Sequence, residues 1–537
     1  MTLFLKNSGQ ACKRLVQAGA VFAAVALVAG CGSVYRPVVT PIGNSGPPSQ
    51  PPAYAIVVSA PSPTTPGIAT IIDYSGDTIL AFANIGPGPS YLTVNEAGTE
   101  GYTLNSDGTL TNFPVSSTLQ AKQVTFSTLS SPSQPSPPHP PVNLFSPANG
   151  LWAADLDGNY ADEFTSSTGV QAFVLAVPVA TTPVLILGPA ITGQRDYAVS
   201  QDFDAPNNTS PNGVACNISP TTAPVNGEAD GIELSSLTIS SHIVLDPNNP
   251  TNNPSGSKNG LCPVYAVQTI DNRRFFVLNR GSDTISVINS QNNTLDNQCP
   301  PPTGCTNQDG QQYFSHPVLP LSLTAVNALN AINPGSGNPP NGTTGMTAIA
   351  GPVYAEYNAA TSQLIVANYD GGTISVIDVS LDEFGNDSAT FGTTYTIPVG
   401  NYPASVTALV DGSRAYTANQ TDQTVTIVNL TSHTVEKTVP VTGHPRTVVS
   451  AQNSQFGKVY VASPDSPYIT ILRTDLDIVD TTILVEGNVV DVRVTSQNVL
   501  GGNSNELSRS PGHGQPCNLP PGLMPSTYTL AQCQAQP

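Results

Sequence analysis

The chain has 537 residues, of which only 10% are charged, and its formal net charge at pH 7 is −19. This acidity argues against a protein that binds nucleic-acid phosphates or anionic membrane surfaces. With 51 Pro, 45 Gly and no long stretch of helical periodicity, the composition is typical of an all-β protein rich in turns.

Residues 1–30 have the pattern of a secretory signal peptide, because a positively charged start is followed by an apolar stretch too short to remain in a membrane. The stretch ends in "LVAGC", which resembles the bacterial lipobox. That resemblance implies cleavage before Cys31 and attachment of lipid to its thiol. Ordinary signal cleavage beside a chance cysteine is the alternative.

Residues 31–52 are rich in Pro, Gly and Ser and cannot bury a core, so they predict a flexible tether. Signal, lipidated Cys31 and tether together predict an exported protein anchored to the cell envelope, on its periplasmic or cell-surface side. The membrane, contacted through this lipid, is the first expected partner.

The first strands follow directly. "YAIVVSA" (54–60) and the segment from 68 to 89 have the pattern of three strands of a four-stranded sheet that lacks its innermost strand. At the other end of the chain, "NVVDVRVTS" (488–496) has the pattern of an innermost strand with no sheet to follow. Pairing these segments would protect two strand edges that otherwise invite aggregation.

Between these ends, a unit recurs. Four segments align without a gap: "FVLNRGSDTISVIN" from Phe276, "IVANYDGGTISVID" from Ile365, "YTANQTDQTVTIVN" from Tyr416 and "YVASPDSPYITILR" from Tyr460. In the first three, the second strand alternates apolar and hydroxyl residues, as a strand does, and polar turn residues precede it. A unit of about 40 to 50 residues with four short strands is the signature of a β-propeller blade.

These segments resemble the YVTN family of β-propeller repeats. The resemblance rests on "YTAN" at Tyr416, "IVAN" at Ile365 and "TISVID" at Thr373, and on the connections "PVGNYP" (398–403) and "PVTGHP" (440–445). It covers about residues 263–500 and implies a propeller whose blades pack face to face around an axis.

The fold class is therefore an all-β propeller of four-stranded antiparallel sheets over residues 53–499, closed by a composite blade from both ends of the chain. Besides that blade, we expect blades near 91–127, 145–178, 182–246, 264–320, 352–399, 403–440 and 445–486. Because 145–246 is irregular enough to form one blade with an insertion, seven blades are expected, with eight as the alternative. Long polar insertions are expected near 128–143, 203–262 and 290–350, and an irregular tail over 500–537.

Six cysteines remain outside the signal and the lipid position, and an even number in an oxidising compartment predicts three disulfides. The sequence leaves the connectivity open. Pairing between neighbours is favoured: Cys216–Cys262, Cys299–Cys305 and Cys517–Cys533. No C-x-x-C pair occurs, which disfavours a zinc site as the alternative.

Few residues indicate chemistry. The chain has no nucleotide-binding Gly-rich loop, no H-E-x-x-H and no G-x-S-x-G, and its six histidines are scattered. His444 and Arg446 lie on a link that, in a propeller, ends beside the central channel, so they are candidate ligand-binding residues; ordinary loop residues are the favoured alternative. The spacing in 155–163 is faintly like a calcium loop but lacks further donors, so an acidic hairpin turn is expected. No catalytic residue, metal site or cofactor is predicted.

A binding or scaffold role is favoured: a monomeric, membrane-anchored propeller for an unidentified protein or glycan, and not for nucleic acid. The alternative is an enzyme, since similar propellers occur in lactonases, lyases and quinoproteins, with sites over the central channel, although fold alone does not license this conclusion. A quinoprotein is expected to stack its cofactor on tryptophan, and the chain has only Trp152. A lyase would need histidine and glutamate gathered on the channel loops, and a haem protein would need C-x-x-C-H, which is absent.

Overall fold

The computed structural model describes the following residues: 54–62, 64–95, 97–128, 141, 143–146, 150–155, 158–165, 173–188, 195–201, 226–249, 259–321, 350–450 and 457–495. Within these ranges, no helix is long and apolar enough to cross a membrane. Several features predicted from the sequence lie outside these ranges: the expected signal peptide, tether and C-terminal tail, and Cys31, Cys216, Cys517 and Cys533.

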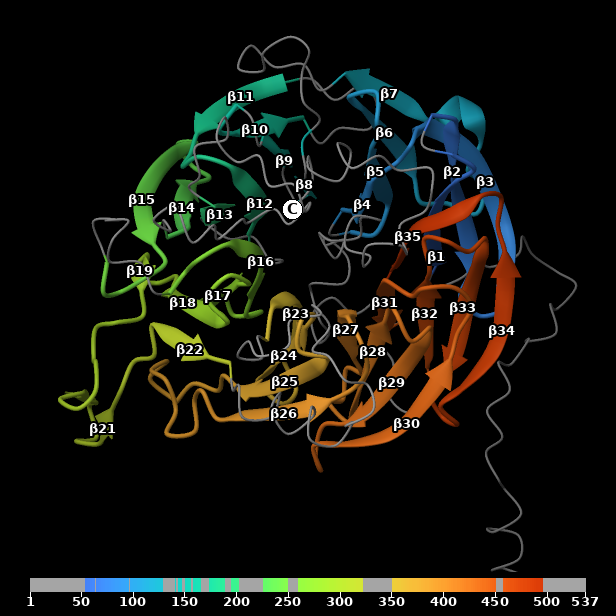
Figure 1. Ribbon diagram of the computed structural model, residues 1–537. Helices are drawn as coiled ribbons and strands as arrows, with labels where there is room; N and C mark the ends of the chain where they lie inside the picture. Colours follow the sequence, from blue (N-terminus) through green and yellow to red (C-terminus); the bar gives the residue numbers. More distant parts are fainter. Residues whose placement is uncertain are drawn as a thin grey trace, which may run out of the picture. The chain divides into compact units, whose positions relative to one another are not determined.

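The described residues form eight antiparallel sheets of four strand positions each, arranged in a ring (Figure 1); in one of them the outermost position is shared by two short strands. We number these blades I to VIII and give the strands of each from the innermost outward. Blade I contains β35 (Asn488–Val494), β1 (Tyr54–Ala60), β2 (Pro66–Asp73) and β3 (Thr78–Pro87). Blade II contains β4 (Tyr91–Val94), β5 (Glu100–Leu104), β6 (Thr109–Pro114) and β7 (Thr125–Thr128), with a short 3-10 helix, η1 (Ala121–Gln123), before β7. Blade III contains β8 (Asn143–Phe145), β9 (Leu151–Asp155), β10 (Tyr160–Phe164) and β11 (Phe173–Pro178).

The remaining blades repeat this order. Blade IV contains β12 (Pro183–Leu187), β13 (Arg195–Ser200), β14 (Glu228–Glu233) and β15 (Thr238–Val244). Blade V contains β16 (Pro263–Gln268), β17 (Arg274–Asn279), β18 (Thr284–Asn289) and β19 (Thr294–Leu295). Blade VI contains β23 (Pro352–Asn358), β24 (Gln363–Asn368), β25 (Thr373–Asp378) and β26 (Thr394–Pro398). Blade VII contains β27 (Pro403–Ala408), β28 (Arg414–Asn419), β29 (Thr424–Asn429) and β30 (Thr434–Pro440), and blade VIII contains β31 (Thr447–Ser450), β32 (Lys458–Ala462), β33 (Tyr468–Arg473) and β34 (Ile478–Leu484).

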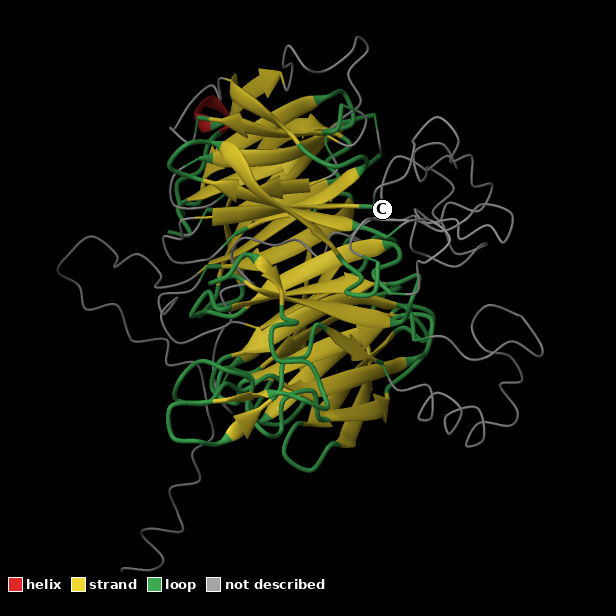
Figure 2. Ribbon diagram, turned by 90° about the vertical axis from the view of Figure 1, so that its left-hand side faces the viewer, coloured by secondary structure: helices red, strands yellow, loops and turns green. Residues whose placement is uncertain are grey.

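The ring is a closed β-propeller. Each innermost strand contacts the innermost strand of the next blade, from β35 through β4, β8, β12, β16, β23, β27 and β31 back to β35. In the side view, the strands form the body of the blades and many of the described loops lie at two opposite faces (Figure 2). The ring has eight blades, the alternative number, and not the expected seven. The segments 143–178 and 183–244 each form a complete sheet, and the long link between β13 and β14 conceals the second of them in the sequence.

The predicted composite blade is confirmed. Strand β1 pairs with β2 on one side and with β35 on the other, in the register Ala55↔Val494 and Val57↔Val492. The Thr495 backbone N–H donates to the Tyr54 carbonyl at 2.8 Å. The two ends of the described propeller are therefore joined by an antiparallel ladder, which has one register shift between Val58 and Ser59.

An asparagine ends the second strand of blades V, VI and VII, and it has a structural role. Asn368 Nδ2 donates to Thr373 Oγ1 at 3.0 Å and to Ser375 Oγ at 2.9 Å, across the hairpin that joins β24 and β25. The same pair of hydrogen bonds recurs from Asn279 and from Asn419. Both faces of these strands are buried because a blade packs on each side, so the hydroxyl face needs these internal partners.

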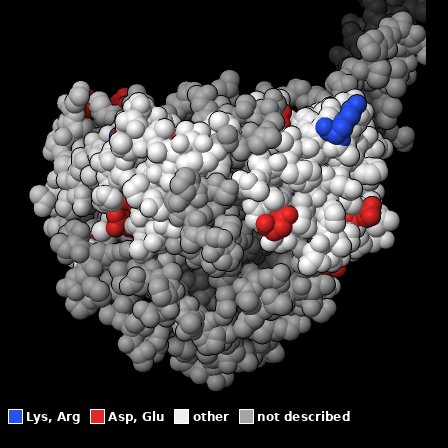
Figure 3. Space-filling view, turned by 90° about the horizontal axis from the view of Figure 1, so that it is seen from above, with Lys and Arg blue, Asp and Glu red and all other residues white. Residues whose placement is uncertain are grey.

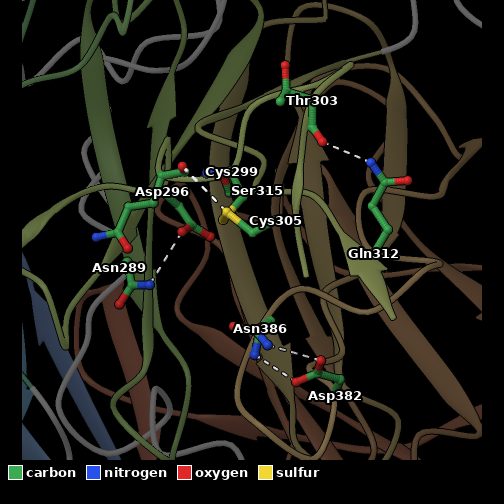
Figure 4. Close-up of a disulfide and its surroundings, with 10 residues drawn as sticks. Asn289, Asp296, Cys299, Thr303, Cys305, Gln312, Ser315, Asp382 and Asn386 are labelled. Carbon is green, nitrogen blue, oxygen red and sulfur yellow. Dashed lines mark hydrogen bonds between the residues drawn. A yellow bond between two sulfur atoms is a disulfide. The ribbon is translucent and has the colours of Figure 1, made fainter. Parts of the chain in front are cut away.

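Part of the insertion expected near 290–350 is folded. Strand β18 pairs with both β19 and β22 (Val318–Pro320), so the outermost strand of blade V is split in two. The residues between the two halves carry a small hairpin of β20 (Cys305–Thr306) and β21 (Gln312–Tyr313). Figure 4 shows the Cys299–Cys305 disulfide beside this hairpin, where Gln312 Nε2 also donates to the Thr303 carbonyl at 2.8 Å.

Candidate functional site

The two residues predicted to face a ligand make contacts within the protein. His444 lies against Asp465, whose carboxylate accepts from the His444 backbone N–H at 2.7 Å and lies 2.5 Å from Nδ1. Gln423 Nε2 lies 3.2 Å from the other ring nitrogen. Arg446 is buried and donates to the Val490 carbonyl on β35. A ligand-binding role for His444 and Arg446 stays a prediction.

Charged side chains are buried where blade VIII meets the composite blade. Asp491, on β35, accepts a hydrogen bond from the hydroxyl of Thr447 on β31 at 2.9 Å and lies 3.2 Å from the Arg493 guanidinium. Both charged side chains are 1% exposed. Asp491 and Arg493 lie on the same strand, β35, so the Thr447 hydrogen bond is the contact that joins β31 to β35 here. The burial of the ion pair leaves little access for a ligand.

A groove lies at the rim of the ring, between the outermost strands of blades III and IV. It has a volume of about 790 Å³ and is lined by residues 175–181, which contain the end of β11, and by residues 237–239 at the start of β15. Most of these side chains are apolar, and none is Phe, Tyr or Trp. Strands β11 and β15 are neighbours in Figure 1, and Figure 3 shows that the described rim seen from above carries few charged side chains, mostly acidic.

The polar residues of the groove include Glu228 and His242, which form a cluster with Asp230. His242 Nδ1 lies 2.6 Å from Asp230 Oδ1 and 3.0 Å from Glu228 Oε1. The Asp230 side chain is fully buried, whereas that of His242 is 65% exposed. Partial burial lowers the pKa of His242, but the two carboxylates outweigh this effect, so that pKa is raised above its usual value.

The local fold brings these three residues together. Glu228 and Asp230 are two positions apart on β14 and therefore point to the same face. Strand β15 returns antiparallel, and its register places His242 directly opposite Asp230. The cluster was not predicted, because the six histidines of the sequence show no pair at metal-ligand spacing and the two acidic ligands lie on a different strand. The available signal was "EAD" followed, one hairpin later, by a histidine on the returning strand.

A second pair of acidic groups, one fully buried and one partly buried, lies between blades III and IV. Asp196, on β13, is fully buried, and neither of its carboxylate oxygens has a hydrogen-bond partner among the described residues. Burial raises the pKa of Asp196 to about 7, and the negative charge of Glu163 on β10 adds to this effect. A Cβ atom at Gly188 would lie 1.7 Å from Asp196 Oδ1, so the carboxyl fits only beside glycine.

The cysteine predictions are partly tested. The structure contains the expected Cys299–Cys305 disulfide. Cys262 is also disulfide-bonded, but Cys216, its favoured partner, lies outside the described residues. The Cys517–Cys533 pair and the lipidation of Cys31 also fall there, so these pairings and the anchor stay predictions.

Two other features of the sequence, the acidic segment 155–163 and Trp152, belong to blade III. The acidic segment 155–163 lies where β9 passes into β10, and Asp155 Oδ1 accepts from the Gly158 backbone N–H at 3.0 Å, as in a hairpin turn. Trp152 is fully buried on β9.

No protein-family model matches the chain, and no curated protein matches it. Among solved structures, AztD from Citrobacter koseri gives a TM-score of 0.49 at 12% identity, over 82% of this chain and 98% of AztD. A proposed 6-phosphogluconolactonase from Bacteroides fragilis gives 0.44 at 13% identity, over 84% of this chain and 100% of that one. Dihydro-heme d1 dehydrogenase NirN gives 0.48 at 11% identity, over 83% of this chain and 76% of its own. Likenesses at this level add no argument about function, and the resemblance to YVTN repeats stays a prediction. The chain is an eight-bladed β-propeller, as its own strand pairing shows.

Proposed function

We propose that this protein is an exported, lipid-anchored β-propeller that binds an extended, apolar segment of a partner protein in the groove between β11 and β15. The observation that carries the proposal is the groove itself, which is hollow, apolar and bordered by two outermost strands. Ligand sites in proteins are typically apolar concavities with a few polar groups, here Glu228 and His242.

Two features favour a protein segment over a glycan. First, β11 and β15 are terminal strands of their sheets in the described part of the chain, and such edges can pair with an added strand. Second, the groove wall offers an exposed apolar side chain for contact with apolar side chains of a partner: Leu175, on β11, is 36% exposed. Among the described residues that line the groove there is no Phe, Tyr or Trp side chain on which a sugar ring would typically stack.

The proposed location at a membrane depends on the predicted signal sequence and on Cys31. Diacylglycerol on the Cys31 thiol, together with an acyl chain on the amine, would hold the propeller stably at a membrane. The test is membrane fractionation of the natural chain and of Cys31→Ala. We expect the variant to leave the membrane fraction and processing of the natural chain to be sensitive to globomycin; a natural chain that is not sedimented with membranes would contradict the anchor.

The groove is tested by selecting peptides from a displayed library of extended decapeptides on the purified protein. We expect enriched peptides to be apolar and their binding to be lost in Leu175→Asp, which places a charge on the groove wall. The matched control is Val435→Asp, since Val435 is 41% exposed on β30, the outermost strand of blade VII. If no peptide is enriched, or if both variants weaken binding equally, the groove is not the binding site.

A further inference from the structure

We propose that Glu228, Asp230 and His242 form a site for a divalent transition-metal ion, for which zinc is the natural probe. One ligand atom from each residue lies within 4.8 Å of the other two. An imidazole nitrogen and two carboxylate oxygens are a donor set that suits zinc and its neighbours in the first transition series.

The cluster combines one fixed ligand with one adjustable ligand. Asp230 is fully buried, and its second oxygen, Oδ2, accepts a hydrogen bond from the Ala180 backbone N–H at 2.7 Å. A hydrogen bond of this kind orients a metal-binding carboxylate. His242, in contrast, is largely exposed on the outermost strand of its blade, so its ring can move without disturbing the core.

The distances require only a small adjustment. The 2.6 Å and 3.0 Å separations in the cluster are hydrogen-bond distances. A tetrahedral ion with bonds of about 2.0 to 2.2 Å holds its ligand atoms roughly 3.3 to 3.5 Å apart. The imidazole would therefore move outward by several tenths of an ångström, toward solvent, while Asp230 stays in place.

Three protein ligands leave a fourth position open. In zinc proteins this arrangement is found where water or another molecule completes the coordination. Glu228 and His242 line the groove, so the open position would be accessible from it. A ligand in the groove could then supply the fourth donor. Metal binding itself does not depend on the groove having a peptide partner.

The alternative is an ion pair between His242 and the two carboxylates that binds no metal. Titration calorimetry of the full chain with zinc chloride, after chelator treatment and in oxidising buffer, separates the two. We expect one zinc ion per chain with a micromolar or tighter Kd. Mutation of a residue that only hydrogen-bonds to a metal ligand commonly lowers metal affinity by about 10- to 100-fold. His242→Ala removes a direct ligand, so it should weaken binding by at least about tenfold.

A control variant, a second ligand variant and a cobalt spectrum show whether zinc binds at this cluster. His433→Ala removes another histidine, which stacks on Tyr395 at 3.7 Å, and should bind zinc like the natural chain. Glu228→Gln should also lose affinity, and it keeps the shape of the side chain if His242→Ala perturbs folding. The cobalt-loaded protein should show visible bands of nitrogen and oxygen ligation.

Three outcomes overturn the proposal: no binding above the buffer blank, unchanged affinity in His242→Ala, or thiolate absorption in the cobalt spectrum. The peptide selection is done without metal, so failure of the metal site leaves the groove proposal standing, and the reverse also holds.

Discussion

Asn368 shows how one residue type holds a blade together. Its amide crosses a hairpin and satisfies two hydroxyl groups that are buried between neighbouring blades. Such groups are costly to leave without partners in an interior. The recurrence of asparagine at the end of this strand is thus explained by local hydrogen bonding, and requires no ligand.

Replacing Asn368 by alanine should lower the free energy of unfolding by about 1 to 3 kcal/mol, because two buried hydroxyl groups lose their donor. The measurement is urea unfolding followed by tryptophan fluorescence and circular dichroism. Asn292→Ala is the control, since Asn292 is an exposed turn residue and its loss should change stability by less than about 0.5 kcal/mol. Equal effects of the two changes would contradict the role given to Asn368.

Asp196 should make stability depend on pH. Its pKa is raised to about 7 in the folded protein, above the usual 3.8. The folded state therefore holds its proton more tightly than the unfolded state does, and this contribution is complete below pH 3.8 and is lost as the pH rises through about 7. The buried carboxylate formed at higher pH opposes folding.

Asp196→Asn removes this titration. Relative to the natural chain, the variant should gain about 2 to 4 kcal/mol in free energy of unfolding between pH 4 and pH 8. Urea unfolding of both proteins across this range measures the difference. A difference that stays constant with pH would show that Asp196 does not titrate as described.

At this scale the sequence predicted little of the candidate site. His444 and Arg446 were chosen for their place in a connection, but their side-chain contacts depend on how neighbouring blades pack. His444 contacts Gln423 and Asp465, each 21 residues away, and Arg446 contacts Val490, 44 residues away. The cluster of Glu228, Asp230 and His242 depends on the register of one hairpin. Its sequence signal lies across two paired strands, β14 and β15, and not along either one.

At the scale of elements, Arg274 anchors the insertion in blade V. It is 2% exposed and lies 3.1 Å from Asp296 in the insertion and 2.9 Å from Asp387 in blade VI. Burial raises the pKa of Asp296 to about 6, although the charge of Arg274 opposes that rise. The arginine therefore compensates two buried acidic groups and joins two neighbouring blades.

Arg274→Met should lower the free energy of unfolding by about 3 to 5 kcal/mol, because two buried carboxylates lose their shared cation. The adjacent Arg273 provides a matched control: it is 40% exposed and lies 3.7 Å from Asp271. Arg273→Met should cost less than about 1 kcal/mol. Thermal and urea unfolding compare the two, and a small effect of Arg274→Met would contradict its role as an anchor.

The elements themselves were largely predictable where the period of two is clean, as in 373–378 and 424–429. The prediction was less certain over 145–246, because the link between β13 and β14 interrupts the repeat. The split outermost strand of blade V was also missed, since β19 and β22 are too short to show periodicity. Both strands can pair with β18 because β22 pairs with the first half of that strand and β19 with its end.

At the scale of the whole molecule, the closure of the ring depends on the two ends of the propeller. Besides the β1–β35 ladder, Ser59 Oγ donates to the Glu486 carbonyl at 2.7 Å. Lys458, in blade VIII, donates to the Tyr74 carbonyl at 2.7 Å and to Asp77 Oδ2 at 2.6 Å in the composite blade. These contacts join the last blade of the chain to the first.

The closure was predictable because each end of the propeller shows an incomplete sheet in its sequence, with a strand pattern that lacks its partner. The groove was not, because its walls come from two blades whose spacing is set by packing. The repeats in the sequence therefore predict the ring of blades, but they do not predict which surface of the ring forms a binding site.

The most direct measurement is a cross-link across the closing seam. Ala55 and Val494 face each other on β1 and β35, next to the hydrogen-bonded pair of Tyr54 and Thr495. Ala55 and Val494 are therefore a non-hydrogen-bonded pair, in which the two side chains approach closely enough for a disulfide. Oxidation of Ala55→Cys/Val494→Cys, followed by peptide mapping, should show this new disulfide in most molecules, whereas Ala55→Cys/Val490→Cys should not form one. If the first pair stays reduced while the protein is folded, the ring is not closed by its two ends.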